Sequence, residues 1–288
     1  MWPAMTLGEY AALEKSLGTP LLRVGGVWWR RVRPFFYRPL FPFAPQTRPP
    51  ACPVAARIGG WQYAVPEGQP ANSHLNYMIF DRPQGYDARS LKPAVRRRQR
   101  LALEQLRFSP LTDLGELATE GLRCLREFFA RTDDYGFRRD RLRPEVFRRW
   151  AAALLAEPKV LVMGAYAGRE LCEVHVSFRV EGVIFFEVSF ASAEGRRRRS
   201  NDGMWHLLRT EAASTDAAFI NVGPAGARLG IDGFKLRRGA RPFSLPARLH
   251  INPLARAALG LLRPAAYERL YGMDEAAAER YCAACPAG

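Results

Sequence analysis

The sequence is poor in lysine and histidine, and it has no long apolar run. Four of its 43 basic residues are lysines, so arginine carries nearly all of the positive charge. No stretch of about 18 uncharged apolar residues occurs, which predicts a chain without a membrane span. The first residues, MWPAMTLGEYAALEKSLG, lack a basic segment followed by an apolar core. We therefore expect no signal peptide and a cytoplasmic protein.

Cysteine is also scarce, with five scattered residues. An odd number of cysteines does not suit a disulfide framework and favours a reducing compartment. Cys282 and Cys285 form one Cys-x-x-Cys pair, without a second pair or a nearby histidine. Because a structural zinc site needs four ligands, the sequence predicts no metal. The Ser-His-Asp order, the P-loop and the HExxH motif are absent, which argues against hydrolases, kinases and zinc proteases.

The composition fits a globular protein with anionic partners. The chain has 288 residues and 48% hydrophobic content, enough for one large or two small domains. The net charge of +15 predicts polyanionic partners such as CoA, nucleotide-linked sugars, tRNA or an anionic membrane surface. The alternative is that the arginine excess reflects genomic composition and serves solubility.

The clearest strand signal lies between Val160 and Gly239. Apolar residues alternate with mixed ones from Leu171 to Val180, and again from Val183 to Phe190. We expect a hairpin with a three- or four-residue turn, because that register puts like faces together. Polar side chains then gather on one face of the hairpin: Glu173, His175, Ser177, Glu187 and Ser189.

An arginine-rich loop, EGRRRRSNDGMWHLL, follows the hairpin. It leads into a helix expected from about Asp202 to Ser214, capped by Ser200, Asn201 or Asp202. The first turn of a helix offers unpaired N–H groups and a positive dipole end, and arginine adds bidentate phosphate donors. The sequence therefore predicts a phosphate-binding site formed by Arg196, Arg197, Arg198, Arg199, Asn201, Asp202 and Gly203.

This order of elements resembles the GNAT acyltransferase fold, in particular its FemAB-like and BioF2-like acetyltransferase branch. A strand at Lys159–Ala165 precedes the hairpin, and a strand at Ala218–Val222 follows the helix. The segment GIDGFKLRRGARP is similar to the family's Phe-Lys-x-x-x-Gly element, matched by Phe234, Lys235 and Gly239. The usual glycine-rich GNAT loop is reduced here to one glycine. The resemblance covers roughly Tyr86 to Arg248.

The resemblance implies an α/β (α+β) fold with a GNAT-like mixed, mostly antiparallel central sheet flanked by helices. It implies an N-acyltransferase that moves an acyl group from acyl-CoA to an amine acceptor. FemAB-like relatives also include enzymes that use aminoacyl-tRNA. The first alternative is therefore a tRNA-dependent ligase that forms an amide on a peptidoglycan precursor or a secondary metabolite. The second is a non-catalytic nucleic-acid-binding protein in which the arginines do all of the work.

The expected organisation is an N-terminal part over 1–85 and a GNAT-like acyltransferase domain over 86–288. Because FemAB-like proteins often carry paired GNAT units, residues 1–85 are interpreted as a degenerate copy with strands but no phosphate loop. We further expect a hairpin through Gly25-Gly26 and a turn at Asp133–Phe137. Helices are expected at Thr6–Leu17, Asp87–Leu106, Thr112–Arg131, Pro144–Ala156, Pro253–Leu262, Pro264–Tyr271 and Asp274–Ala284.

Acyl transfer to an amine needs a base and a group that polarises the donor carbonyl. A backbone N–H on a splayed central strand often polarises the carbonyl. Glu187, Glu173 and His175 are the candidate bases, because all lie on the mixed hairpin face. The resemblance implies that Lys235 serves the donor or the developing oxyanion. Substrate contacts are assigned to Asn221, Ser177 and Ser189.

Each candidate also has an ordinary structural interpretation. His175 can be a hydrogen-bonded sheet residue, Glu187 an ion-pair partner and Lys235 a surface residue. The arginines of the helix at Asp87–Leu106 either form a solvated face or contact an acceptor phosphate or the tRNA backbone. These are Arg96, Arg97, Arg98 and Arg100.

Overall fold

The computed structural model describes residues 2–132, 139–226 and 229–285. The chain forms two compact units, each built from several segments. The first unit contains Met1–Leu17, Phe80–Gly223 and Arg237–Ala240, and the second contains Gly18–Ile79, Pro224–Leu236 and Arg241–Gly288. The segments of the two units alternate along the sequence, whereas the predicted parts, 1–85 and 86–288, are each one continuous segment. The interpretation of residues 1–85 as a degenerate GNAT-like copy stays a prediction.

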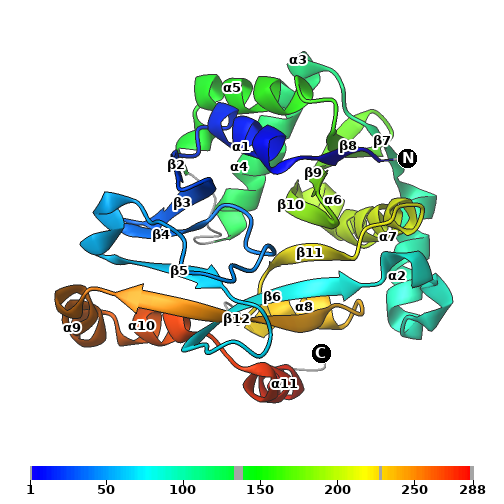
Figure 1. The fold of residues 1–288 in the computed structure, drawn as a ribbon. Helices are drawn as coiled ribbons and strands as arrows, with labels where there is room; N and C mark the ends of the chain where they lie inside the picture. The colour runs from blue at the N-terminus through cyan, green and yellow to red at the C-terminus, as the bar shows by residue number, and fades with distance from the viewer. Residues whose placement is uncertain (1, 133–138, 227–228, 286–288) are drawn as a thin grey trace. The chain divides into compact units, whose positions relative to one another are not determined.

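The first unit is built on a mixed, mostly antiparallel sheet, as the sequence predicted (Figure 1). Antiparallel pairing joins β7 (Arg107–Pro110), β8 (Val160–Ala167), β9 (Glu170–Val180) and β10 (Val183–Ala191) in that order. The parallel partner of β10 is β11 (Phe219–Pro224). A two-residue strand, β1 (Ala4–Met5), runs parallel to the end of β9.

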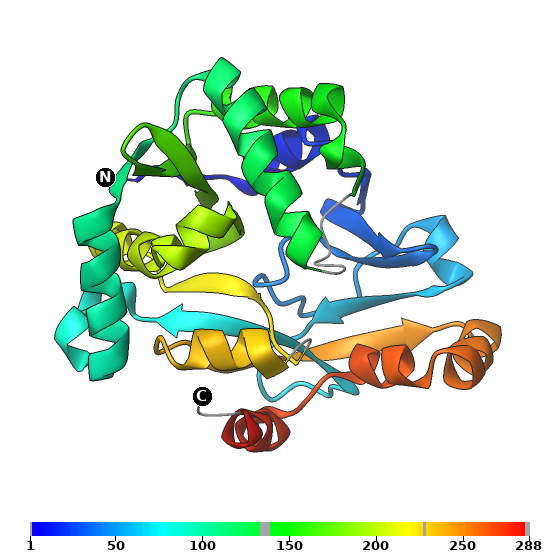
Figure 2. The same cartoon turned by 180° about the vertical axis from the view of Figure 1, so that it is seen from behind.

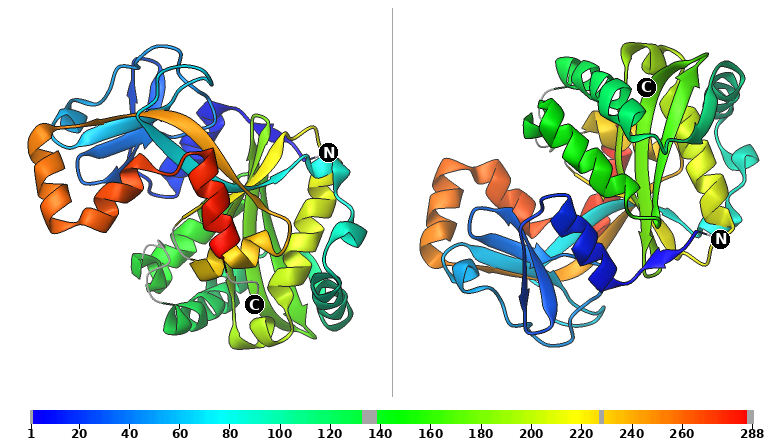
Figure 3. Two further views of the ribbon diagram at one scale, coloured as in Figure 1. Left: turned by 90° about the horizontal axis from the view of Figure 1, so that it is seen from below. Right: turned by 90° about the horizontal axis from the view of Figure 1, so that it is seen from above.

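Helices cover both faces of this sheet (Figure 3). On one face lie α4 (Leu122–Arg131) and α5 (Pro144–Leu155), where Phe147 packs against Phe190 with ring centroids 6.2 Å apart. On the other face lies α7 (Ser200–Ala213), whose Trp205 packs on Phe186 at 5.0 Å. Behind α7 lies α2 (Pro93–Gln105). As a result, every residue of β9 from Leu171 to Val180 is buried.

The turn of the β9–β10 hairpin differs from the prediction. Val180 pairs with Val183, so the turn contains only Glu181 and Gly182. Glu181 adopts a positive φ of 50°, which allows this tight connection. The predicted three- or four-residue turn is therefore wrong. By itself, a two-residue turn would place the two polar faces on opposite sides of the hairpin.

A β-bulge in β10 compensates for the short turn. The register shifts between Phe186 and Val188, which makes Glu187 the extra residue of β10. Beyond the bulge, Ser189 pairs with His175. Polar side chains of the two strands therefore share one face after all, with Glu187 set apart at the irregularity.

The strand set of the second unit is also mixed (Figure 2). Its order is β2 (Leu21–Val24), β3 (Val27–Arg33), β4 (Phe36–Pro39), β5 (Gly60–Ala64), β12 (Arg241–Ile251) and β6 (Ser73–Asp81). All neighbours are antiparallel except β4 and β5, and the predicted hairpin at Gly25-Gly26 joins β2 to β3. Its helices are α8 (Leu229–Leu236), α9 (Pro253–Leu262), α10 (Pro264–Tyr271) and α11 (Glu275–Ala284).

The predicted helices are present: α5, α9 and α10 begin at the predicted prolines, whereas α1 (Leu7–Ser16) and α2 begin later than predicted. Helix α1 begins after Thr6, which forms the expected cap. Helix α2 begins at Pro93 rather than near Asp87, because the residue before a proline is kept out of the helical region. The segment Thr112–Arg131 contains α3 (Leu114–Glu116), a π-helical turn and α4. The turn predicted at 133–137 lies outside the described residues. No helix of the described chain is long and apolar enough to cross a membrane.

Candidate active site

In the first unit, β10 and β11 part from one another after a short paired stretch. Their last pair is Phe185 with Asn221, although β10 continues to Ala191 and β11 to Pro224. The bulge at Glu187 follows at once on β10. Backbone groups of β10 beyond Phe185 therefore take no part in pairing with β11. This is the splayed arrangement that the sequence analysis expected for polarising a carbonyl.

Two predicted site residues lie at this opening. Glu187 is exposed on the bulge. Asn221 is buried, and its Oδ1 accepts a hydrogen bond from the backbone N–H of Gly223 at 3.1 Å. Gly223 has a φ of 95°, a conformation that suits glycine. Asn221 therefore holds the end of β11 in place, whereas Glu187 is accessible to a ligand.

Helix α7 begins at Ser200, earlier than predicted. Its cap residue is Arg199 in the left-handed conformation, with a φ of 64°, and no side chain caps the helix. The predicted caps Ser200, Asn201 and Asp202 are instead inside the first turn. The start of this uncapped helix of 14 residues carries the positive end of the helix dipole, which favours a nearby anion, although the N–H of Asp202 already donates to Arg199 O at 2.8 Å.

The four arginines before α7 fall into two pairs. Arg197 and Arg198 form ion pairs with Glu194, with 2.7 Å between Arg197 Nη2 and Glu194 Oε1. These guanidinium groups hold the pKa of Glu194 below its ordinary value. Arg196 and Arg199 are exposed, and neither has a carboxylate partner in the described parts of the chain. The spacing Glu194-x-x-Arg197-Arg198 is a signal that the sequence analysis missed.

Asn201 points from the first turn of α7 toward the sheet. Its Nδ2 donates to Glu173 Oε1 at 3.1 Å and lies 3.2 Å from Ser189 Oγ. Ser189 also donates to Glu173 Oε1. The three side chains link β9, β10 and the start of α7, so they hold the arginine loop against the sheet.

Asp202 and Gly203 also face the interior. The Asp202 carboxylate is buried and forms an ion pair with Arg238, whose side chain is buried as well. Gly203 packs closely on β7: a Cβ atom at this position would lie 2.4 Å from Phe108 Cζ. Neither residue is directed toward a ligand at the helix start, and both fix the place of α7.

Glu173 and His175 lie on the sheet face covered by α7. Glu173 is fully buried, and burial raises its pKa although hydrogen bonds from Ser189 and Asn201 oppose the shift. Burial lowers the pKa of His175 to about 3, so its ring is neutral at pH 7. His175 Nε2 lies 3.1 Å from Ser177 Oγ. The predicted base His175 and the predicted substrate contact Ser177 are therefore hydrogen-bonded to each other inside the sheet. Both acid–base groups are enclosed under α7, and a catalytic role for either stays a prediction.

We expect the Glu173→Gln variant to become more stable relative to wild type as the pH rises. A carboxyl whose pKa is raised on folding stabilises the protein fully below its unfolded pKa, and this contribution is lost as the pH rises through the folded pKa. Glutamine does not ionise, so it avoids this loss, which is at most about 1.4 kcal/mol per pH unit. Urea unfolding of both proteins from about pH 4 to about pH 9 measures the difference between their free energies of unfolding at each pH. An exposed carboxyl variant, Glu211→Gln, is the control; parallel curves for Glu173→Gln and wild type would contradict the prediction.

Lys235 belongs to the second unit and lies in α8, where it is buried, so it is not a surface residue. Its Nζ donates to the backbone oxygen of Pro224 at 3.3 Å and lies 3.9 Å from Asp232 Oδ1. Burial lowers the pKa of Lys235 to about 8, although Asp232 acts in the opposite direction. A donor or oxyanion role for Lys235 stays a prediction.

Comparisons with known proteins give matches at the level of structure. No protein-family model and no curated protein matches the sequence. The crystal structure of FemX has a TM-score of 0.57 at 12% identity, covering 89% of this chain and 93% of that chain. The structure of L-PGS from Bacillus licheniformis has a TM-score of 0.56 at 10% identity, covering 92% and 96%.

A third structure agrees with these two. It is the C-terminal domain of a putative lysylphosphatidylglycerol synthetase from Agrobacterium fabrum, with a TM-score of 0.54 at 12% identity, covering 92% of this chain and 93% of that chain. At such identities the likeness concerns the fold, and it extends over both compact units. The chain therefore shares the fold of these three structures, and its mixed, mostly antiparallel sheet flanked by helices is the fold class that the sequence predicted.

Proposed function

We propose that the protein is an acyltransferase that holds a phosphate-bearing acyl donor at the start of α7 and passes the acyl group to an amine. The main support is the pair of exposed arginines, Arg196 and Arg199, beside an uncapped helix start. Guanidinium groups and helix N–H groups together suit phosphate oxygens. The parting of β10 and β11 offers backbone groups for the donor carbonyl. The fold of FemX and L-PGS agrees with such a role.

In this mechanism the residues divide the work between binding and chemistry. Arg196 and Arg199 bind the donor phosphates. Backbone N–H groups of β10 beyond the bulge stabilise the negative charge that develops on the carbonyl oxygen. Glu187, exposed on the bulge, accepts the proton of the acceptor amine as the amine attacks the carbonyl carbon. The tetrahedral intermediate then collapses as the bond between the acyl carbon and the carrier breaks, and the carrier leaves with a proton as free CoA or tRNA. Glu173, Asn201 and Ser189 keep the helix start in position.

We expect Glu187→Gln to lower kcat by about 100-fold with little change in KM for the donor, because glutamine cannot accept a proton. Steady-state kinetics with the donor that the protein uses measures this loss. Glu187→Asp should restore part of the rate, since it keeps a carboxylate. Glu211→Gln removes an equally exposed charge from α7 and should change neither constant. A normal kcat for Glu187→Gln would exclude Glu187 as the base.

The leading donor is acyl-CoA, and the leading test is transfer from acetyl-CoA to a panel of amines. Purified protein should bind CoA and release it from acetyl-CoA when a suitable amine is present. Mass spectrometry of the purified protein identifies any donor that remains bound. If the protein shows no turnover of acetyl-CoA and does not bind CoA, acyl-CoA is ruled out as the donor.

Aminoacyl-tRNA is the second candidate, favoured by the net charge of +15 and by arginines on α2. Arg96, Arg97 and Arg100 are exposed there. A tRNA donor should bind with an affinity that falls steeply as salt rises, since each neutralised phosphate releases counterions. Binding of nucleic acid without any acyl transfer would instead identify a non-catalytic nucleic-acid-binding protein.

A further inference from the structure

Exposed apolar side chains gather at one end of the second unit. Among the described residues, eight large apolar side chains are strongly exposed, and five of them belong to this end. They are Val54, Ile58, Leu254, Leu261 and Leu262, with exposed fractions of 78%, 59%, 83%, 84% and 77%. We call these five residues the α9 patch. Asn252, before α9, ties the two segments together, since its backbone N–H donates to Gly59 O at 3.1 Å and its Nδ2 to Arg57 O at 3.0 Å.

The outer side of α9 is an apolar stripe. Leu254, Ala258 and Leu261 follow one another at i, i+4 and i+7, so they lie on one side of the helix, and all three are exposed. No residue of α9 is buried. A soluble helix normally turns such a stripe toward the core, and a contiguous exposed apolar surface marks an interaction site. Something outside the second unit therefore covers this helix.

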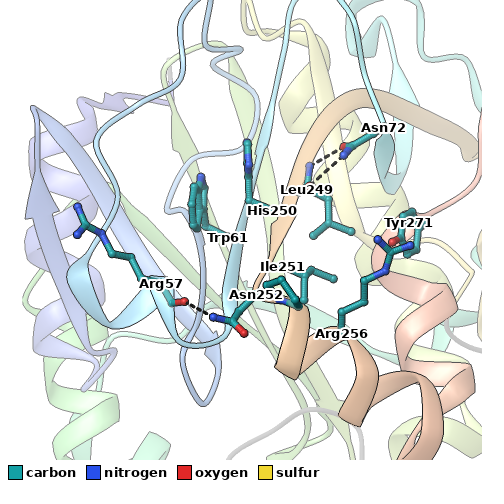
Figure 4. A pocket seen from close by; sticks show the side chains of 10 residues that line it. Arg57, Trp61, Asn72, Leu249, His250, Ile251, Asn252, Arg256 and Tyr271 are labelled. Carbon is teal, nitrogen blue, oxygen red and sulfur yellow. Dashed lines mark hydrogen bonds between the residues drawn. The ribbon is translucent and has the colours of Figure 1, made fainter.

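A cavity of about 450 Å³ opens beside the start of α9 (Figure 4). Its wall includes Trp61 and His250, whose rings stack with centroids 4.6 Å apart. Arg57 and Arg256 lie at opposite sides of this ring pair, and none of the lining residues is acidic. The guanidinium of Arg256 lies beside Tyr271, whereas that of Arg57 lies beyond Trp61, on the side away from His250 (Figure 4).

Further contacts prepare the cavity for an anion. Arg256 Nε donates to Tyr267 Oη at 2.9 Å, and this oxygen lies 2.8 Å from Tyr271 Oη, so the guanidinium is held at the wall. The positive end of the α9 dipole also opens here, because Pro253 at the first helical position lines the cavity. The buried His250 Nε2 has no hydrogen-bond partner in the described chain. These features suit a phosphate group.

The surroundings decide between the possible occupants. In a symmetric contact with a second copy, the arginines around the patch would face their own kind on a chain of net charge +15. RNA would use the arginines but leave the exposed leucines in water. An anionic bilayer uses both, because apolar side chains enter the headgroup boundary while arginines meet lipid phosphates. We propose that the α9 patch docks on an anionic lipid bilayer while Arg57 and Arg256, beside the patch, each meet the phosphate of a lipid headgroup.

Co-sedimentation of the full-length protein with lipid vesicles tests this proposal. The protein should bind vesicles that contain phosphatidylglycerol and should bind pure phosphatidylcholine vesicles at least about tenfold more weakly. Combined replacement of Leu254, Leu261 and Leu262 by serine should lower binding at least about tenfold. Arg57→Gln with Arg256→Gln should lower it about 25-fold, roughly fivefold for each arginine.

Matched variants elsewhere separate this surface from general stickiness. Leu22→Ser with Leu103→Ser removes other exposed leucines, and Arg148→Gln with Arg149→Gln removes two exposed arginines of α5. Both controls should bind as wild type does, and circular dichroism checks that every variant is folded. Equal losses in controls and patch variants would overturn the proposal. So would a leucine variant that changes the oligomeric state but not vesicle binding, or glycerol 3-phosphate binding as tightly as vesicles.

Discussion

Reversing the charge of Arg196 and Arg199 together is expected to lower the affinity for the acyl donor by at least about 100-fold. A hydrogen bond to a charged group contributes about 1.5–3 kcal/mol, so the loss of two such contacts corresponds to about 3–6 kcal/mol. At about 1.4 kcal/mol per tenfold change, this predicts a 100-fold effect or more. Isothermal titration calorimetry with CoA, at one low salt concentration, measures it. Reversal adds repulsion to the loss of contact.

The control must change the charge equally without touching the loop. Arg148→Glu with Arg149→Glu does so on the exposed side of α5 in the same unit. Arg197→Glu is a second comparison, because Arg197 is already paired with Glu194 and should matter less than Arg199. If tRNA is the donor, the double reversal should reduce the slope of log affinity against log salt by about two. Unchanged affinity in the Arg196/Arg199 variant would mean that phosphates bind elsewhere.

The hairpin illustrates what sequence periodicity can and cannot predict. Alternation identified β9 and β10 and grouped Glu173, His175 and Ser189 on one face. It could not locate the bulge, because Glu187 is in phase with the alternation and only the pairing with β9 reveals the extra residue. The two-residue turn shifts the pairing of β10 with β9 by one residue, and the bulge shifts it by one residue again. The prediction that these polar side chains share one face is therefore right, although the predicted turn length is wrong.

Alternation also says nothing about what covers a mixed face. Polar residues along β9 were interpreted as the wall of a catalytic site, but α7 lies over them and encloses Glu173 and His175. The covering residues Asn201 and Trp205 come from a helix whose position is set by tertiary packing. A polar strand face is therefore ambiguous until its neighbouring layer is known.

The segment before α7, predicted as a loop, contains the short helix α6 (Ala193–Arg197), and it shows a similar limit for charges. The sequence showed four arginines and a helix start, and both are present. It treated the arginines alike, although the local spacing to Glu194 would have separated Arg197 and Arg198 from the others. The interior roles of Asp202 and Gly203 depend on Arg238 and Phe108, which are distant in the sequence. No local pattern carries that information.

Asp202→Ala is expected to destabilise the protein by about 3–5 kcal/mol. The Asp202–Arg238 ion pair is almost fully buried, with side chains 6% and 3% exposed, so removing the carboxylate leaves a buried guanidinium charge without its acid. Burial already lowers the pKa of Arg238, which reflects the cost of keeping this charge inside. Urea unfolding at pH 7 measures the change in free energy. Removing both charges, by Asp202→Leu with Arg238→Met, should cost less than Asp202→Ala, because no unpaired charge remains.

An exposed ion pair supplies the comparison. Arg100 and Glu104 lie one turn apart on α2 with side chains 72% and 58% exposed, and Glu104→Ala should cost about 0.3–0.5 kcal/mol. A loss below about 1 kcal/mol for Asp202→Ala would contradict a structural role for the buried pair. Asp202 lies in the first turn of α7, one residue from Asn201 and its contact to Glu173. If the proposed phosphate site depends on the position of this turn, the folded fraction of Asp202→Ala binds CoA more weakly than wild type does. A folded variant with normal CoA affinity would separate the stability of α7 from the phosphate site.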